Sequence, residues 1–274
     1  MTTFLVLCLG GYAALVAALY AGQRALMYYP DATVPEPADH EVPDMTVVKI
    51  PVGEGIESLA WWHPPTEPTG PIVVYFHGNA GHIGERGYKA RAMIDAGYGV
   101  LLAGYRYNAG AGGKPSEPTL IADGATAMRH VLDLGYGKEQ LVLYGESLGS
   151  GIAVALAAEH DVAGLILETP YSSVADVAQS RYWYTPAKWL IWDSYDSMAR
   201  IGRVRAPILL FHGTRDETIP IRFARLLHEA APEPKEAHFF PGGAHTDLYD
   251  HGAARLVIDF LERRAATAPV RGAQ

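Results

Sequence analysis

Short apolar runs alternate along the chain with longer stretches in which apolar and polar residues recur at helical spacing. The runs are nearly continuous in hydrophobicity and too short for helices, which is typical of strands buried on both faces of a sheet. The five clearest runs are Ile72–Phe76, Gly99–Ala103, Leu141–Tyr144, Gly164–Leu167 and Ile208–Phe211. They predict a parallel sheet at the centre of the protein.

The stretches between and after these runs have the length and apolar spacing of crossover helices. They are Glu85–Ala96, Leu120–Leu134, Leu148–Ala158, Ile221–Ala230 and Ala253–Arg264. Two earlier segments, Met45–Ile50 and Glu57–Trp62, are separated by two glycines and predict a leading hairpin. The whole pattern predicts an α/β fold, with a mostly parallel central sheet flanked by helices.

The N-terminal apolar segment is longer than any of the predicted strands. From Phe4 to Ala21 the chain carries no charge, and about 18 residues rising roughly 1.5 Å each nearly match the bilayer core. A cleaved signal peptide and a buried core helix are the alternatives. However, Met1–Thr3 lacks the Lys or Arg of a signal peptide, and a helix apolar on every face suits lipid best. We expect residues 1–24 to form a retained transmembrane anchor.

The residues after this segment suggest its orientation and the domain plan. Arg24 follows the apolar run and no side-chain charge precedes it, which places the following domain on the cytoplasmic side. Four prolines predict an extended linker over residues 25–44. Residues 45–264 contain no charge run or low-complexity linker, so we expect one domain there and a flexible tail over 265–274.

Composition excludes several classes of function. The 274 residues are 49% hydrophobic and 19% charged, as in a well-packed globular protein. The net charge of -8, with no Lys/Arg cluster, makes nucleic acid an unsuitable partner. Cys8 is the only cysteine, so neither an intramolecular disulfide nor a cysteine metal site can form. We expect no cofactor and no metal.

The best candidate nucleophile is Ser147, at the centre of the motif Gly145-Glu146-Ser147-Leu148-Gly149. With 29 glycines in the chain, a Gly-x-Ser-x-Gly pattern is a weak signal by itself. Here it follows a predicted strand and opens a predicted helix, which is the context of a nucleophile elbow. The flanking glycines let neighbouring backbone approach the strained turn that exposes the hydroxyl.

A serine hydroxyl needs a base to take its proton and a carboxylate to orient that base. Asp216 lies in the loop after the strand Ile208–Phe211 and is the predicted acid. Three other carboxylates remain as alternatives: Glu217, Asp193 and Asp196. His245, in a glycine-rich loop after a last short strand, is the predicted general base. A metal site made of His245, Asp247, Asp250 and His251 is an alternative use of this region.

Acyl transfer also needs donors for the oxyanion that forms on the attacked carbonyl. One is expected to be the backbone N–H of Leu148, which follows the nucleophile. The other is expected from the loop after Ile72–Phe76, where we choose the backbone N–H of Asn79, with Ala80 as the alternative. His77 in this loop is expected to be a structural hydrogen-bonding residue and not a second base.

These motifs together resemble the α/β-hydrolases of the Bem46-like group, which is related to the serine aminopeptidase S33 and monoacylglycerol lipase branch. The matching stretches are Gln23–Pro30, Phe76–Gly81, Lys114–Glu117, Gly145–Gly149, Leu167–Pro170, His212–Asp216 and Gly243–His245. The resemblance covers about residues 25 to 262 and implies the same triad of Ser147, Asp216 and His245. It departs at Gly104–Ala111, where relatives read Asp-Tyr-Arg-Gly-Tyr-Gly-x-Ser.

An insert at about residues 170–205 is expected to form a small helical cap over the site. It is rich in large aromatic residues: Tyr182, Trp183, Tyr184, Trp189, Trp192 and Tyr195. One interpretation is that these rings line a site for a lipid-like acyl chain. The other is that they pack the cap onto the sheet.

The sequence therefore predicts a membrane-anchored serine hydrolase that cleaves carboxylic esters or thioesters through an acyl-serine intermediate. Its partners would be a small-molecule or lipid-like acyl substrate and the membrane. A peptidase with the same triad is the first alternative, with Glu146 or Glu168 binding the substrate amine. A non-catalytic membrane scaffold is the second.

Overall fold

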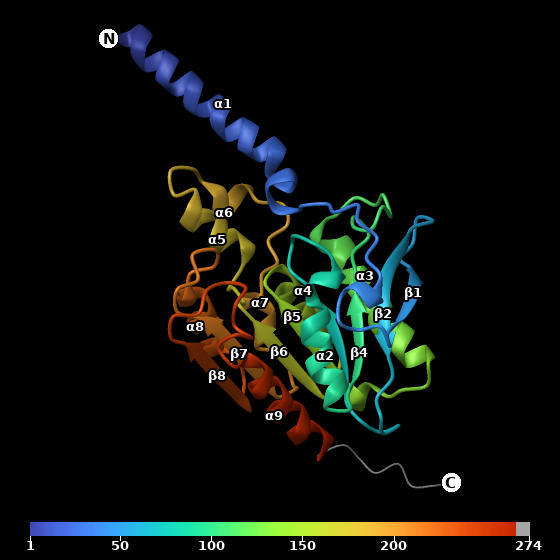
Figure 1. The fold of residues 1–274 in the computed structure, drawn as a ribbon. Helices are drawn as coiled ribbons and strands as arrows, with labels where there is room; N and C mark the ends of the chain where they lie inside the picture. The colour runs from blue at the N-terminus through green and yellow to red at the C-terminus, as the bar shows by residue number, and fades with distance from the viewer. Residues whose placement is uncertain (267–274) are drawn as a thin grey trace.

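The computed structural model describes residues 1–266, and in this part of the chain eight strands form one sheet with the order β1-β2-β4-β3-β5-β6-β7-β8 (Figure 1). β1 pairs with β2 and β2 with β4 in antiparallel fashion, and the other neighbours are parallel. The strands are β1 (Thr46–Pro51), β2 (Glu57–His63), β3 (Ile72–Phe76), β4 (Gly99–Ala103), β5 (Leu141–Glu146), β6 (Gly164–Glu168), β7 (Ile208–Gly213) and β8 (Lys235–Phe240). The predicted mostly parallel α/β sheet is confirmed.

Helices cover both faces of this sheet. The main ones are α2 (Gly87–Asp95), α3 (Glu117–Asp133), α4 (Leu148–Glu159), α8 (Ile221–Ala230) and α9 (Ala253–Ala265). Buried residues of α3, α4 and α8 belong to one hydrophobic cluster, and those of α2 and α9 belong to the other. The flexible tail predicted over residues 265–274 lies, from residue 267 onward, outside the described residues.

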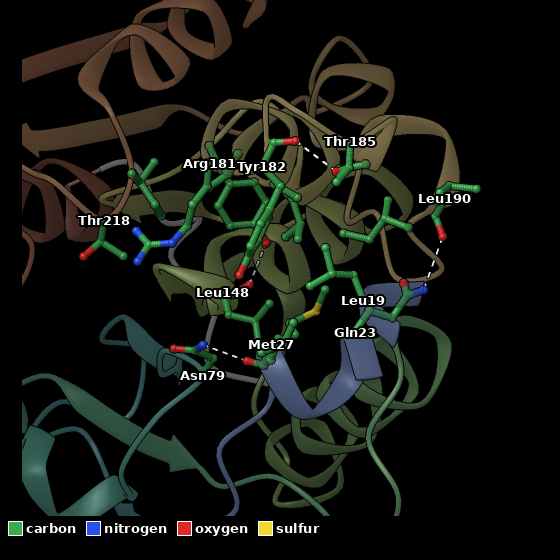
Figure 2. Close-up of a pocket in the computed structure, with 18 of the residues that line it drawn as sticks. Leu19, Gln23, Met27, Asn79, Leu148, Arg181, Tyr182, Thr185, Leu190 and Thr218 are labelled. Carbon is green, nitrogen blue, oxygen red and sulfur yellow. Dashed lines mark hydrogen bonds between the residues drawn. The ribbon is translucent and has the colours of Figure 1, made fainter. Parts of the chain in front are cut away.

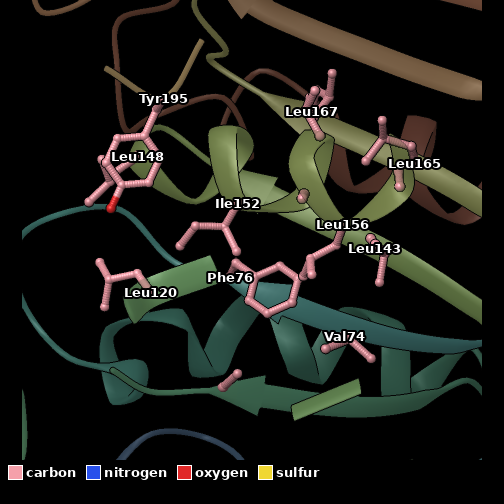
Figure 3. Close-up of a cluster of buried hydrophobic side chains, with 14 of the residues drawn as sticks. Val74, Phe76, Leu120, Leu143, Leu148, Ile152, Leu156, Leu165, Leu167 and Tyr195 are labelled. Carbon is pink, nitrogen blue, oxygen red and sulfur yellow. The ribbon is translucent and has the colours of Figure 1, made fainter. Parts of the chain in front are cut away.

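Strand residues divide between these two clusters with a period of two, as expected for strands buried on both faces. In β3, Val74 and Phe76 face the cluster beneath α3 and α4, and Val73 and Tyr75 face the opposite one. Figure 3 shows Phe76 beside Ile152 of α4, in the space between that helix and the sheet. This packing fixes the position of α4 over the carboxyl end of β5.

Two helices start at residues other than those predicted, and a capping box explains the first difference. α3 begins at Glu117 because the Ser116 side chain accepts a hydrogen bond from the Thr119 N–H, forming a capping box. The segment Ile83–Arg86 is a short 3-10 helix, and α2 begins only at Gly87.

The N-terminal helix α1 (Thr2–Met27) extends away from the domain (Figure 1). It is long and apolar enough to cross a membrane, as anchors and signal sequences are, and none of its residues is buried. The part of α1 from Tyr12 onward lies against the rest of the chain. There it contacts the region of three short helices, α5 (Val174–Arg181), α6 (Ala187–Leu190) and α7 (Met198–Ile201), which follows β6.

Candidate active site

Ser147 lies in the sharp turn between β5 and α4. Its φ of 51° and ψ of -118° are unusual for a residue with a side chain, and such a conformation costs about 1–3 kcal/mol. The turn leaves no room for a side chain on either side: a Cβ at Gly149 would collide with the Phe76 carbonyl, and one at Gly145 with α4 backbone. The Ser147 N–H donates to the Glu168 carbonyl at 2.9 Å. These contacts hold the strained turn in place.

The hydroxyl of Ser147 lies beside the imidazole of His245. His245 Nε2 is 3.0 Å from Ser147 Oγ, and His245 Nδ1 is 2.7 Å from Asp216 Oδ2. The three residues follow β5, β7 and β8, and their loops meet at one edge of the sheet. Because an ionised carboxylate only accepts hydrogen bonds, Nδ1 carries the proton in the neutral imidazole and Nε2 is free to accept one from Ser147.

Besides His245, three other groups hold the Asp216 carboxylate in place. Its Oδ1 accepts hydrogen bonds from the N–H groups of Thr218 and Ile219, both at 2.8 Å, and its Oδ2 lies 3.1 Å from His212 Nε2. Burial alone would raise the pKa of Asp216, but the hydrogen bonds from His212 and His245 lower it below its ordinary value. Asp216 is therefore ionised at neutral pH and orients His245.

The other carboxylates considered from the sequence serve different purposes. Asp193 is buried and forms an ion pair with Arg24 of α1 at 2.8 Å. Asp196 accepts a hydrogen bond from the Ala199 N–H at the start of α7. Glu217 is exposed. None of the three is bonded to His245 in the described part of the chain.

The loop after β3 lies directly against the nucleophile. A Cβ built at Gly78 would come within 3.5 Å of the Ser147 Cβ. Asn79 lines the same cavity as Ser147 and Leu148, and its side-chain amide donates to the Met27 carbonyl at 2.7 Å. The Asn79 carbonyl accepts from the Tyr29 N–H at 3.3 Å. Both sequence-predicted oxyanion donors thus belong to residues at the edge of the site.

His77 is buried in this loop and stacks on the Tyr105 ring, with the two ring centroids 4.3 Å apart. Neither ring nitrogen has a hydrogen-bond partner among residues 1–266, so the structural hydrogen bond expected of His77 is made by its backbone and not by its ring. Burial lowers the pKa of His77 to about 3, which keeps the imidazole neutral at physiological pH. The carbonyl of His77 contributes instead, accepting from the Tyr105 hydroxyl at 2.6 Å.

A buried charge cluster beneath the nucleophile was not predicted from the sequence. Lys89 Nζ lies 3.1 Å from Glu146 and 2.8 Å from Glu168, and Arg86 Nη2 lies 2.7 Å from Glu146. The Tyr75 hydroxyl also donates to Glu146, and Tyr144 donates to Glu168 at 2.6 Å. The sequence does contain a signal for this cluster. Glu146 and Glu168 lie just after two predicted buried strands, and Arg86 and Lys89 lie three residues apart at the start of a predicted helix.

The buried ion pairs shift the pKa values of Lys89 and Glu146, and they connect the nucleophile turn to the loop after β3. Burial would lower the pKa of Lys89, but the two facing carboxylates hold it above its ordinary value. Burial would raise the pKa of Glu146, yet Lys89 and Arg86 hold it well below the usual range. Because Glu146 immediately precedes Ser147, and Arg86 also reaches the carbonyl of His82, the cluster joins the nucleophile turn to the loop after β3.

Ser147 lies at the edge of a cavity of about 490 Å³. Figure 2 shows Leu19, Gln23 and Met27 of α1 on one side of it and Tyr182 and Thr185 of the cap region on the other. The lining is largely aliphatic and aromatic. Among the described residues that line it, Arg181 carries the only formal charge.

The exposed aromatic residues of the cap region fit neither sequence interpretation completely. Tyr195 is buried and packs the cap onto the domain, and Tyr182 lines the cavity. Trp183, Trp189 and Trp192 instead point outward, with 77%, 83% and 46% of their surface exposed. The sequence shows that these rings are clustered but cannot show which way each one faces.

Within residues 1–266, the alternative metal residues His245, Asp247, Asp250 and His251 do not form a group that could hold a metal ion. His245 is turned toward Ser147, and Asp247 accepts a 2.7 Å hydrogen bond from the Ala244 N–H. His251 lies 3.7 Å from Asp247. Their arrangement shapes the loop that carries His245.

Comparison with known proteins identifies relatives across most of the chain. The profile of a family described as serine aminopeptidase, S33, matches residues 67–191. An uncharacterised protein of Mycobacterium tuberculosis is 33% identical over 258 residues, covering 93% of this chain and 91% of the relative. Protein bem46 of Schizosaccharomyces pombe is 30% identical over 210 residues, covering 73% and 70%. The solved structure of a Pyrococcus furiosus esterase is similar in fold, with a TM-score of 0.69 at 16% identity, covering 87% of this chain and 98% of the esterase chain.

Proposed function

The chain belongs to the Bem46-like family of α/β-hydrolases, and from this premise we propose that it is a membrane-anchored serine hydrolase that cleaves carboxylic esters or thioesters of acyl groups. The observation that carries the proposal is the contact of His245 with both Ser147 and Asp216, at 3.0 Å and 2.7 Å. This arrangement is what acyl transfer to a serine requires.

In the first half of the proposed reaction, Ser147 Oγ attacks the substrate carbonyl carbon while its proton passes to His245 Nε2. The carbonyl oxygen becomes an oxyanion, which accepts hydrogen bonds from the backbone N–H groups of Asn79 and Leu148. A donor of this kind contributes about 3–4 kcal/mol to lowering the barrier. The tetrahedral intermediate then collapses, the alcohol or thiol leaves with the proton from His245, and the acyl group remains on Ser147.

In the second half, a water molecule gives a proton to His245 Nε2 and attacks the acyl-Ser147 carbonyl. Collapse of the second tetrahedral intermediate returns the proton to Ser147 and releases the carboxylic acid. Asp216 stays ionised throughout, since its role is to hold the Nδ1 proton and stabilise the imidazolium.

The walls of the cavity support an acyl substrate. Aliphatic and aromatic side chains line most of it, and a volume of about 490 Å³ lies within the range of small-molecule sites. An apolar acyl chain gains free energy by leaving water for such a surface.

The charges around the site favour ester substrates over peptides with a free N-terminal ammonium group. An aminopeptidase needs a free carboxylate for the substrate ammonium group. Glu146 and Glu168 are both buried and are already paired with Lys89, so neither is available for this role. Arg181, which lines the cavity, would repel an ammonium group.

The proposal is tested by measuring turnover of acyl p-nitrophenyl esters of increasing chain length, acyl thioesters and amino-acid anilides. We expect ester and thioester turnover by the full-length protein in detergent micelles, and none by the Ser147→Ala variant. Faster turnover of the anilides would identify a peptidase. Equal turnover by the Ser147→Ala variant would exclude Ser147 as the nucleophile.

A further inference from the structure

Four large aromatic side chains between residues 183 and 192 of the cap region are exposed. They are Trp183, Tyr184, Trp189 and Trp192, which we name the cap aromatic face. Exposed single apolar residues are common on soluble proteins, but three exposed tryptophans within ten residues are not. Indole and phenol rings combine an apolar body with a polar group, and they are enriched where membrane meets water.

Residues of the cap aromatic face contact α1, the helix that is apolar enough to cross a membrane. The Tyr12 hydroxyl of α1 donates to the Tyr184 carbonyl at 3.0 Å. Farther along α1, Gln23 accepts from the Trp192 N–H at 2.7 Å, and the Tyr20 and Trp192 rings lie 5.0 Å apart. The contacts therefore run along α1 from Tyr12 to the Arg24–Asp193 ion pair.

The length of α1 sets the depth of these contacts. At about 1.5 Å per residue, a helix needs about 20 residues to cross a bilayer core about 30 Å thick, and Arg24, the first charged residue of α1, marks the water side. A helix that crosses the core must therefore place the stretch from Tyr12 to about Tyr20 in the hydrocarbon. The cap is bound to this same stretch, so the cap aromatic face lies at the level of one leaflet.

We propose that the cap aromatic face inserts into the leaflet that surrounds the C-terminal half of α1, so that the catalytic cavity opens toward lipid. The occupant of this surface is the bilayer itself. Two cations lie in this region: exposed Lys188, between the tryptophans in sequence, is paired with Asp176 at 2.6 Å, and Arg181 lies at the cavity. Long cationic side chains at this depth reach the phosphate groups of lipids.

The cavity extends this proposal to the route of the substrate, a step that rests on the proposed function. Val16, Leu19, Tyr20 and Gln23 of α1 form one wall of the cavity that ends at Ser147. An acyl chain that lies beside α1 in the leaflet can enter between the helix and the cap. It would then reach Ser147 without crossing water.

The insertion itself is tested without any catalytic measurement, by quenching tryptophan fluorescence in vesicles of phosphatidylcholine brominated on the acyl chains. The five tryptophans divide clearly, since Trp61 and Trp62 lie in β2 and the other three in the cap. We expect strong quenching of the full-length protein, and a loss of at least about half of it in Trp183→Phe/Trp189→Phe. The matched control Trp62→Phe keeps the full quenching. Quenching that is equally strong in the double variant, or absent from the natural protein, would contradict insertion.

A second experiment tests the substrate route and separates it from the proposed function. In Trp183→Asp/Trp189→Asp, we expect turnover of a long-chain ester embedded in vesicles to fall about tenfold or more, because a charge resists entry into lipid. Turnover of a soluble short-chain ester stays within about twofold and reports correct folding. The control Leu134→Asp changes an exposed residue at the C-terminal end of α3, whereas Glu117, which bonds to Tyr195 of the cap, begins the same helix. Equal losses on both esters would contradict lateral entry, whereas inactivity of the natural protein on every ester would contradict the proposed function.

Discussion

The side-chain amide of Asn79 donates a 2.7 Å hydrogen bond to the carbonyl of Met27, the last residue of α1. The Tyr29 N–H returns a bond to the Asn79 carbonyl. The loop that we propose to supply an oxyanion donor is thus hydrogen-bonded to the C-terminal end of α1. α1 and the loop beside the active site therefore form one structural unit.

Replacing Asn79 by Ala keeps the backbone N–H but removes the bond to Met27. We expect kcat to fall about tenfold with little change in KM, less than the 10²–10³ lost when a whole oxyanion donor is removed. Gln140→Ala is the control, because this buried amide bonds to the carbonyls of Pro68 and Gly70 at the other end of the sheet. Steady-state kinetics on a soluble ester measure both variants. An unchanged kcat in Asn79→Ala would show that the loop holds its position without α1.

The lowered pKa of Asp216 makes stability depend on pH in a defined direction. The folded state holds the carboxylate ionised below the ordinary value of 3.8, so its contribution to stability is complete above that value. The contribution is lost as the pH falls through the lower folded value. We expect the natural protein to be more stable than Asp216→Asn at pH 7 and the difference to shrink near pH 3. Urea unfolding at both pH values measures it, and a difference that grows in acid would contradict the assignment.

Lys89 is paired with two buried carboxylates, and its removal leaves Glu168 without its cation, whereas Glu146 keeps its ion pair with Arg86. We expect Lys89→Met to lower the free energy of unfolding by about 3–5 kcal/mol, with partial recovery in Lys89→Met/Glu168→Gln. Arg205→Met is the control, since Arg205 and Asp161 form an exposed ion pair. Thermal unfolding compares the three variants. A Tm unchanged in Lys89→Met would mean that the cluster does not support the fold.

The fold and the three catalytic candidates could be predicted because they depend on local pattern and chain order. Continuous apolar runs indicate buried strands, and Ser147, Asp216 and His245 each follow a strand whose carboxyl end reaches the same edge. The contacts of Lys89 and Asn79 could not be predicted in this way. They depend on the register between β5 and β6 and on the angle at which α1 leaves the domain, and no short stretch of sequence encodes either one.

The sequence also could not predict which side chains of the cap are buried and which are exposed. Tyr195 and Trp192 are three residues apart, yet the first is buried against Tyr28 and the second is exposed beside Tyr20. The cap helices are short and α6 has four residues, so hydrophobic periodicity is too brief to define a buried side. Which rings face the cavity depends on the position of α1, because residues of α1 form one wall of the cavity.

The cavity provides a test of acyl-chain binding that is independent of the membrane. Ala178 on α5 lines it, and Ala178→Trp would fill part of its volume. We expect turnover of a long-chain ester in micelles to fall about tenfold, and turnover of the acetyl ester to change less than about twofold. Ala199→Trp on the exposed side of α7 is the control. Equal losses for both chain lengths would place the acyl chain elsewhere.

The most direct test of the central claim is reaction of the full-length protein with a fluorophosphonate, followed by mass spectrometry of the labelled peptide. An activated serine attacks the phosphorus, so we expect one adduct per chain, located on Ser147, and no adduct in Ser147→Ala. His245→Ala should react far more slowly, because no base takes the hydroxyl proton. A folded protein that never reacts, or an adduct on another residue that persists in Ser147→Ala, would contradict the assignment of Ser147 as the nucleophile.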